Sequence, residues 1–218
     1  MAQKINPIIH RIPVTQGWRS KWFAHGKQYK KLLQQDIQVR KFLKNKLSEA
    51  GVDHVELERS PDQLSVNIYT SKPGVVIGRG GMGADNLKKE IKSNFFKNEK
   101  LSVQINIKEV DKPQLSAGIV AQNIAQDLTK RIPYRRTIKR ALDQIMKAGA
   151  IGAKLELKGR LDGIEIARKE RLQAGKLPLQ TFRADIDYSR TAAFTTYGAV
   201  GIKVWIYKGE VFEKKKRV

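Results

Sequence analysis

One glycine-rich stretch constrains the fold of this chain more than any other part. From Val75 the sequence reads Val-Val-Ile-Gly-Arg-Gly-Gly-Met-Gly-Ala-Asp-Asn, so a short apolar run enters a loop and a helix-like segment leaves it. Leu87 and Ile91 recur four residues apart on one side of that segment, and Lys88 and Lys89 lie off that side. The N–H groups at a helix start attract anions. The stretch therefore predicts a phosphate-binding site where a loop meets a helix.

Three interpretations fit these glycines. Gly78, Gly80 and Gly83 match G-x-G-x-x-G, the dinucleotide fingerprint, which needs a full strand before the loop and an acid about 20 residues further on. Only three apolar residues separate the loop from a Pro-Gly pair, and Glu99 precedes the next strand-like run, so this interpretation is the weakest. Gly78 and Gly81 match G-x-x-G, by which a KH domain clamps a nucleic-acid backbone. A plain glycine-rich turn that caps a helix fits equally well.

The charge of the chain points to a polyanionic partner. The 218 residues include 43 Lys and Arg but 21 Asp and Glu, which gives a net charge of +22. Residues 1–109 hold 20 basic and 10 acidic residues, and residues 110–218 hold 23 and 11, so both halves are basic. Nucleic acid is the leading neutralising partner. An anionic membrane surface ranks second, because the sequence shows no strongly amphipathic basic helix rich in Trp and Leu.

The composition also excludes several kinds of chemistry. The chain has no cysteine, which removes disulfides, cysteine–zinc sites and thiol catalysis. Its three histidines, His10, His25 and His54, are scattered and suggest no metal site. No apolar run approaches the roughly 18 residues of a membrane span, and the first residues lack the apolar core of a signal peptide. We expect a cytoplasmic protein that needs neither metal nor cofactor.

The first half follows the order helix, strand, strand, glycine loop, helix, strand. Residues 28–50 carry a helical apolar pattern, and residues 55–58 and 64–70 alternate as strands do. The Ser-Pro-Asp turn between these strands predicts a hairpin. A hairpin connection is too short for a parallel crossover, so a doubly wound sheet is excluded. A strand at residues 101–108 closes this unit.

Residues 1–27 are expected to form an irregular arm. Trp22 and Phe23 are aromatic among basic residues, and we expect them to pack onto the domain that follows. The basic side chains of the arm are expected to contact RNA instead; they are His10, Arg11, Arg19, Lys21 and Lys27.

The second half predicts two helices and four strands. Asp111 and Gln114 have the spacing of a capping box, so the first helix is expected to begin there and to end near Ile132. Four alternating runs follow a second helix, and an antiparallel sheet with both helices on one face accounts for them. The predicted strands lie at residues 155–157, 164–166, 182–188 and 200–206.

The second of these helices, residues 134–148, predicts a basic face. At 100° per residue its apolar side chains fall on one side, which indicates a half-buried helix. A charge run is usually a solvated face, but solvation alone does not explain five cations with a single acid, Asp143, on the other side. The cations are Arg135, Arg136, Lys139, Arg140 and Lys147.

Short motifs along nearly the whole chain resemble one known family. They are Pro-Gly-Val-Val-Ile-Gly from Pro73, Gln-Ile-Asn-Ile from Gln104, Arg-Arg-x-x-Lys-Arg from Arg135, Arg-Ala-Asp-Ile-Asp-Tyr from Arg183, and Thr-Tyr-Gly-x-x-Gly-Ile-Lys-Val-Trp-Ile from Thr196. Together they resemble the KH-containing protein of the small ribosomal subunit, numbered three in bacteria. In one departure, the loop carries a single cation between Gly78 and Gly81, where relatives often carry two.

The resemblance implies an α+β fold: an arm (1–27), a type II KH domain (28–109), an α+β domain with two helices on a four-stranded antiparallel sheet (110–208), and a basic tail (209–218). It implies a structural constituent of the small subunit, without covalent chemistry, that binds ribosomal RNA in the subunit head beside other head proteins. It further implies that the basic helix meets messenger RNA where the message enters. The candidate RNA-binding residues are Gly78, Arg79, Gly80, Gly81, Lys88, Lys89, Arg135, Arg136, Lys139, Arg140, Arg160 and Arg168.

Two other functions remain open. An enzyme would use the Asp185 and Asp187 pair, which alternate onto one strand face, together with Glu165 or Glu170. Arg183 flanks that pair, so a structural row of ion pairs is the better interpretation. A non-ribosomal KH adaptor or RNA chaperone would share the loop but not the motifs of the second domain.

Overall fold

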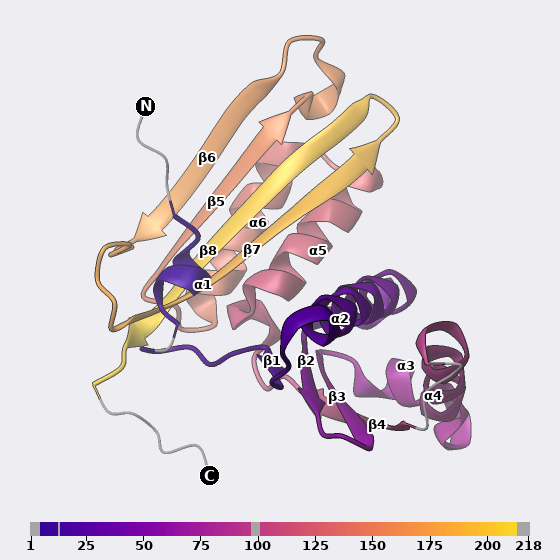
Figure 1. The fold of residues 1–218 in the computed structure, drawn as a ribbon. Helices are drawn as coiled ribbons and strands as arrows, with labels where there is room; N and C mark the ends of the chain where they lie inside the picture. Colours follow the sequence, from indigo (N-terminus) through magenta and orange to yellow (C-terminus); the bar gives the residue numbers. More distant parts are fainter. Residues whose placement is uncertain (1–4, 13, 97–100, 213–218) are drawn as a thin grey trace. The chain divides into compact units, whose positions relative to one another are not determined.

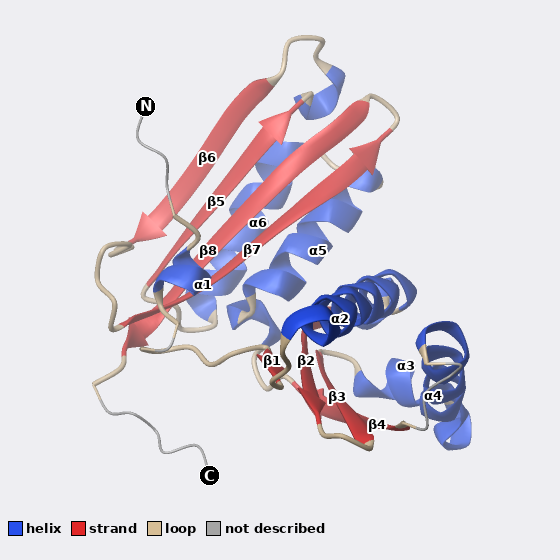
Figure 2. Ribbon diagram, in the orientation of Figure 1, coloured by secondary structure: helices blue, strands red, loops and turns tan. Residues whose placement is uncertain are grey.

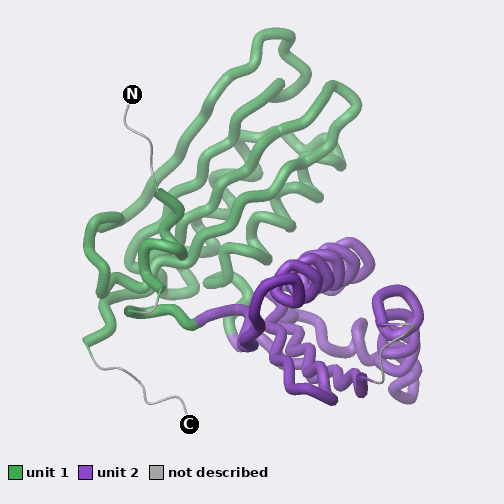
Figure 3. Tube along the Cα trace, viewed as in Figure 1, with its two compact units in different colours: residues 1–17, 112–218 green, residues 18–111 purple. Residues whose placement is uncertain are grey.

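The fold was analysed in a computed structural model, which describes residues 5–12, 14–96 and 101–212. Contacts divide the chain into two compact units, shown in Figure 3: unit 1 comprises residues 1–17 and 112–218, and unit 2 comprises residues 18–111. The sequence predicted a separate arm at residues 1–27, whereas the described residues up to Gly17 belong to unit 1 and those from Trp18 onwards to unit 2. Residues 213–218 of the predicted tail lie outside the described residues.

Unit 2 has the element order that the sequence predicted (Figure 1). The short apolar run before the glycine loop forms a short helix, α3, because Pro73 starts a helical turn there. The elements are β1 (Ser20–Lys21), α2 (Gly26–Lys46), η1 (Ser48–Ala50), β2 (Val52–Arg59), β3 (Gln63–Thr70), α3 (Pro73–Ile77), η2 (Arg79–Gly81), α4 (Met82–Phe95) and β4 (Ser102–Glu109).

The sheet of unit 2 runs in the order β1-β2-β3-β4. Strands β2 and β3 pair antiparallel, as the predicted hairpin requires, and β4 pairs parallel to β3 after the chain has crossed through α3 and α4. Alternate residues of β3, among them Leu64, Val66 and Ile68, are fully buried against the helices. Leu87 and Ile91 of α4 are buried in the same core, so the predicted helix face is confirmed.

Unit 1 is an α+β layer structure, with α5 and α6 on one face of a four-stranded antiparallel sheet (Figure 2). The strand order is β6-β5-β8-β7, so the fold class predicted from sequence is confirmed. The elements are α1 (Pro7–His10), η3 (Pro113–Leu115), α5 (Ala117–Thr129), α6 (Tyr134–Lys147), β5 (Gly152–Gly159), η4 (Leu161–Gly163), β6 (Arg168–Gly175), β7 (Ala184–Thr195) and β8 (Gly198–Glu210).

Two sequence predictions for unit 1 were wrong. The predicted strand at residues 164–166 is a loop in which Ile166 is 78% exposed, and the strand is β6, which pairs with β5 further along the chain. Helix α5 begins at Ala117 rather than at the predicted capping box. The Ser116 hydroxyl accepts a hydrogen bond from the backbone N of Ile119, which makes Ser116 the N-cap.

The N-terminal segment is fixed to unit 1 by Arg11, whose side chain is fully buried. Its Nε donates to the backbone oxygen of Ala184 at 2.7 Å, and its terminal nitrogens donate to the backbone oxygens of Pro7, Leu179 and Thr181 at 2.9–3.0 Å. The expectation that Arg11 contacts RNA was therefore wrong, because its guanidinium is already bound to backbone oxygens.

Candidate RNA-binding surfaces

The glycine loop connects α3 to α4 through a run of unusual backbone angles. Gly78, Gly80 and Gly81 have φ values of +69°, +61° and +81°, in the left-handed region that residues with a Cβ rarely adopt. Arg79 lies among them and is exposed, as are the glycines on either side. The chain can therefore turn sharply while keeping its backbone close to the surface.

Two glycines of the loop are required by close packing. A Cβ on Gly83 would lie 2.7 Å from the oxygen of Val76, and a Cβ on Gly78 would lie 3.0 Å from the backbone N of Gly83. A Cβ on Gly80 or Gly81 would meet nothing within 4 Å. Gly78 and Gly83 thus hold α3 against the start of α4, whereas Gly80 and Gly81 form the open tip.

The start of α4 lies at this open tip. No side chain caps the helix, because its N-cap is Gly81. Lys88 and Lys89 are exposed further along α4, off the side that buries Leu87 and Ile91. Exposed apolar side chains also flank the tip, a feature not predicted from the sequence; they are Val75 (56% exposed), Ile77 (41%) and Met82 (64%). The loop joins helix N–H groups, cations and apolar surface in one place.

Helix α6 carries the second candidate surface. Tyr134, Ile138, Leu142 and Ile145 are buried against the sheet, so the predicted apolar face is confirmed. The opposite side is exposed and forms a shallow groove with a single acid, Asp143. The cations that line this groove are Arg135, Arg136, Lys139, Arg140 and Lys147.

The first turn of α6 is held by neighbouring groups. Arg135 Nε donates to the Tyr134 hydroxyl at 3.1 Å, and this hydrogen bond raises the pKa of Arg135 above its usual value. Asp162 Oδ1 accepts a hydrogen bond from the backbone N of Tyr134 at 3.4 Å. The 3-10 turn η4 therefore supplies a carboxylate to the helix start, where negative charge is favourable.

Arg160 and Arg168, also predicted to bind RNA, lie at the β5–β6 connection of the same unit. Arg160 Nε donates to the oxygen of Ile164 at 3.1 Å, and its Nη1 donates to the oxygen of Tyr197 at 2.9 Å. Arg160 thus braces the β7–β8 hairpin against η4, a role not foreseen from sequence. Arg168 is exposed at the start of β6.

Asp187, one of the carboxylates considered for an enzyme, has a structural partner. Asp187 Oδ2 accepts a hydrogen bond from the backbone N of Ala117 at 2.8 Å, so it adds a second cap to α5. Arg183 pairs with Glu210 at 3.2 Å. Within the described residues, no three His, Cys, Asp or Glu side chains gather where they could hold a metal ion.

The other basic and aromatic residues of the predicted arm have mixed environments. Trp22 Nε1 donates to Asp36 Oδ2 at 2.7 Å, so its packing onto unit 2 was predicted correctly. Phe23 is 81% exposed, so its predicted packing was wrong. Lys21 forms an exposed ion pair with Glu58.

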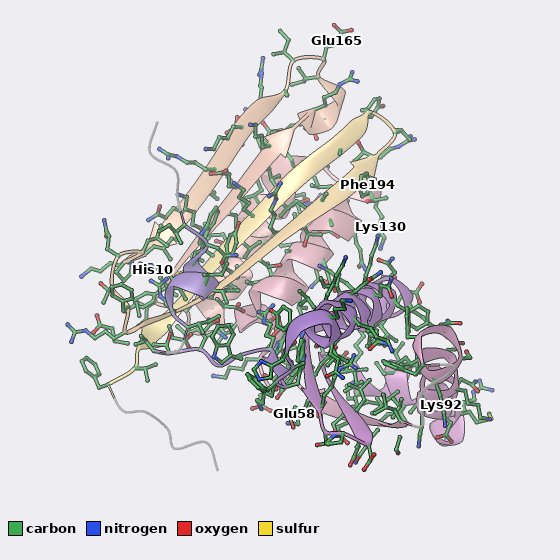
Figure 4. All side chains as sticks on the ribbon, viewed as in Figure 1. His10, Glu58, Lys92, Lys130, Glu165 and Phe194 are labelled. Carbon is green, nitrogen blue, oxygen red and sulfur yellow. The ribbon has the colours of Figure 1, made fainter. Side chains whose placement is uncertain are left out.

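The candidate residues thus form two surfaces, one on each unit. Figure 4 draws the side chains of both units, with Lys92 of α4 and Lys130 at the end of α5 labelled. Unit 2 carries the glycine loop with Lys88 and Lys89. Unit 1 carries the α6 face, with Arg160 and Arg168 at the neighbouring strand connection. No helix in the described part of the chain has the length and apolar character needed to cross a membrane.

Comparison with known proteins agrees with this division. Residues 38–115 match the KH domain family, and residues 124–206 match the C-terminal domain of ribosomal protein S3. Small ribosomal subunit protein uS3 of Desulfitobacterium hafniense is 49% identical over 99% of this chain and 96% of its own length. The uS3 protein of Legionella pneumophila (strain Corby) is 49% identical over 100% of this chain and 97% of its own length. The uS3 protein of Pelagibacter ubique is 48% identical over 99% of this chain and 93% of its own length.

The fold and its surfaces define an RNA-binding protein of the KH class, with a second basic α+β domain. Within this class, sequence identity of nearly one half with the uS3 proteins, over almost the full length of both chains, identifies one family. The chain belongs to the small ribosomal subunit protein uS3 family, and the resemblance stated from its motifs is confirmed.

Proposed function

We propose that this chain, as a structural constituent of the small ribosomal subunit in the cytoplasm, binds ribosomal RNA in the subunit head and meets messenger RNA through the basic face of α6. The observation that carries the proposal is the set of exposed cations on one side of α6, with Asp143 as their single acid. A rigid helix buried on its other side presents this charge in a fixed geometry. The other proposed partners are proteins of the subunit head.

The glycine loop is proposed to contribute a backbone contact to ribosomal RNA. Its tip is exposed, its helix start has no side-chain cap, and Gly80 and Gly81 leave room for a phosphate to approach. KH loops of the G-x-x-G type clamp nucleic-acid backbones in this way. Arg79 is the one cation at the tip, so backbone N–H groups carry much of the attraction.

The test of the messenger-facing role replaces Arg135, Arg136, Lys139 and Arg140 by alanine. Alanine is the best helix former and the buried face is untouched, so the variant folds and still assembles into the small subunit. Translation then slows on a message with a stable hairpin just downstream, relative to an unstructured message. Unpaired strand is held beside the helix only while cations neutralise its phosphates.

A matched control removes four exposed cations elsewhere in unit 1, namely Lys158, Arg171, Lys176 and Arg190. Its net charge equals that of the α6 variant, and it should translate both messages at an unchanged ratio. Equal rates on both messages for the α6 variant, once incorporated, would refute the messenger-facing role. Failure to assemble would assign these four residues to ribosomal RNA.

A non-ribosomal KH adaptor is the alternative. The match of residues 124–206 to the S3 C-terminal domain disfavours it, because an adaptor would need only the KH unit. Co-sedimentation of the full chain with small subunits in a sucrose gradient separates the two. An adaptor would remain at the top of the gradient.

A further inference from the structure

A cavity of about 340 Å³ lies where the turn between α5 and α6 meets η4 and the β7–β8 hairpin. Buried apolar side chains form its floor, namely Leu128, Tyr134, Leu161 and Val200. This volume is within the range of small-ligand sites, which combine apolar walls with a few polar groups. The exposed Tyr197 stands at the rim, where its ring lies 3.4 Å from the Cβ that Gly163 lacks.

The cavity adjoins the basic face of α6. The ring of Tyr134 belongs to the floor, and the hydroxyl of Tyr134 accepts the hydrogen bond from Arg135 Nε. The cavity and the basic face therefore meet at the first two residues of α6, because Tyr134 lines the cavity and Arg135 lines the groove.

The rim of the cavity is positively charged. Arg131 is exposed, and no ion pair or side-chain hydrogen bond joins it to the described residues. Arg160 uses Nε and Nη1 for its two backbone contacts, and none of the hydrogen bonds found among the described residues uses its Nη2. Asp162 is the one acid among the lining residues, and its Oδ1 already accepts from the backbone N of Tyr134. The rim is thus complementary to phosphate.

The backbone of Arg131 gives a separate reason to assign the rim a function. Arg131 has a φ of +61° in the turn that ends α5, and its N–H donates to the oxygen of Leu128 at 3.0 Å. Helices that end in this left-handed conformation favour glycine there, because a Cβ makes it unfavourable. Folding alone does not explain a guanidinium at this position, and unfavourable backbone conformations cluster at functional sites.

We propose that the cavity binds the base of one unpaired nucleotide, with the flanking phosphates against Arg131 and Arg160. This inference rests on the proposed path of single-stranded RNA along α6. Unpaired bases are recognised when they leave the stack and lie against aromatic side chains, which Tyr134 and Tyr197 supply here. The cavity holds a base by its shape and by apolar contact, so it accepts different bases with little sequence preference.

The test uses small subunits that contain the full chain and messages with a single 4-thiouridine at successive positions of the entering segment. Ultraviolet cross-linking and mass spectrometry then identify the residues beside the base. At one message position, we expect cross-links on Tyr134 or Tyr197. Thr196→Trp places a bulky ring at the mouth of the cavity from an exposed hairpin residue, and it should lower that yield about tenfold.

Two further variants separate a cation at the rim from net charge alone. Arg131→Gly removes the rim cation and relieves the left-handed backbone, so we expect a lower cross-link yield without loss of stability. Lys130→Ala removes the adjacent exposed cation, which does not line the cavity, and should leave the yield unchanged. Equal effects of the two variants would show that only net charge matters and would overturn the base site.

The remaining outcomes distinguish this inference from the proposed function. Cross-links on Arg135 or Arg136 with none in the cavity would keep RNA on α6 but overturn the base site. Cross-links in neither place would overturn both. Protection of Tyr197 from solvent in subunits without message would assign the cavity to another component of the subunit and overturn the inference as well.

Discussion

The guanidinium of Arg11 donates a 2.7 Å hydrogen bond to the backbone oxygen of Ala184, 173 positions further along the chain. Further bonds reach the oxygens of Leu179 and Thr181, so one side chain joins the N-terminal segment to the start of β7. Burial lowers the pKa of Arg11, and the nearby Asp185 carboxylate partly opposes that shift. Because the guanidinium remains charged at any working pH, its hydrogen bonds to neutral oxygens are strong ones.

Replacing Arg11 by methionine should therefore destabilise unit 1. Several buried backbone oxygens would lose their donor, and each unsatisfied group is costly, so we expect a loss of about 3 kcal/mol or more. Urea denaturation followed by circular dichroism measures the change. Arg171→Met removes an exposed arginine of the same unit and should be nearly neutral. Similar midpoints for the two variants would show that the Arg11 contacts contribute little to stability.

The loss of stability on replacing a loop glycine by alanine should depend on how closely that glycine is packed. Gly80→Ala meets only the cost of a left-handed residue, about 1–2 kcal/mol. Gly78→Ala should cost about another 1–3 kcal/mol, because its φ of +69° with a ψ of −177° is essentially restricted to glycine and its Cβ would lie 3.0 Å from the backbone of Gly83. Urea midpoints of the two variants test the order. A larger loss for Gly80→Ala would mean that the loop tip, not its base, holds α3 and α4 together.

Periodicity predicted much of the fold because the buried faces are regular. Leu87 and Ile91 on α4, and Ile138 and Leu142 on α6, are buried where their spacing indicated. The prediction failed where tertiary contacts override local pattern. Ile164 and Ile166 alternate like a strand, yet the chain first makes the η4 turn and pairs β6 with β5 only from Arg168 onwards.

The candidate site was predictable only in part for a similar reason. The cations of α6 lie on one face of a single helix, so their arrangement follows from spacing. The role of Arg160 depends on Tyr197, and that of Arg11 on Ala184, contacts between positions far apart in sequence. In the sequence all these arginines are simply basic residues. Composition does not distinguish an arginine that is bound to backbone oxygens from one that is free to contact RNA.

Asp187 should act as a cap of α5 rather than as a functional acid. Its carboxylate accepts the N–H of Ala117, and a negative charge there also interacts favourably with the helix dipole. Asp187→Ala should therefore cost about 1 kcal/mol in unfolding free energy. Lys208→Ala removes the cation 4.0 Å from Asp187, at a partly exposed pair, and should be nearly neutral. Equal losses for the two variants would assign the stabilisation to the ion pair instead of the cap.

The glycine loop should bind RNA through backbone charge, and a charge-reversed tip tests this. Arg79→Asp with Gly80→Asp places two carboxylates beside the start of α4, which turns attraction for phosphate into repulsion. The fold should remain, because a Cβ at Gly80 meets nothing and aspartate tolerates the left-handed region better than most residues. Circular dichroism on the same samples verifies that point.

RNA affinity of the loop variant should fall, and its salt dependence should weaken with it. Each phosphate that a single strand loses as a contact lowers the slope of log affinity against log salt by roughly 0.7. The control Lys41→Asp with Asn45→Asp makes the same charge change on exposed positions of α2 and should retain most of that slope. If the loop variant and the control keep equal slopes and affinities, the loop is a structural turn and RNA binding resides elsewhere. A wild-type affinity that barely responds to salt would instead mean that apolar contact of the bases with Val75, Ile77 or Met82 outweighs the phosphate contacts.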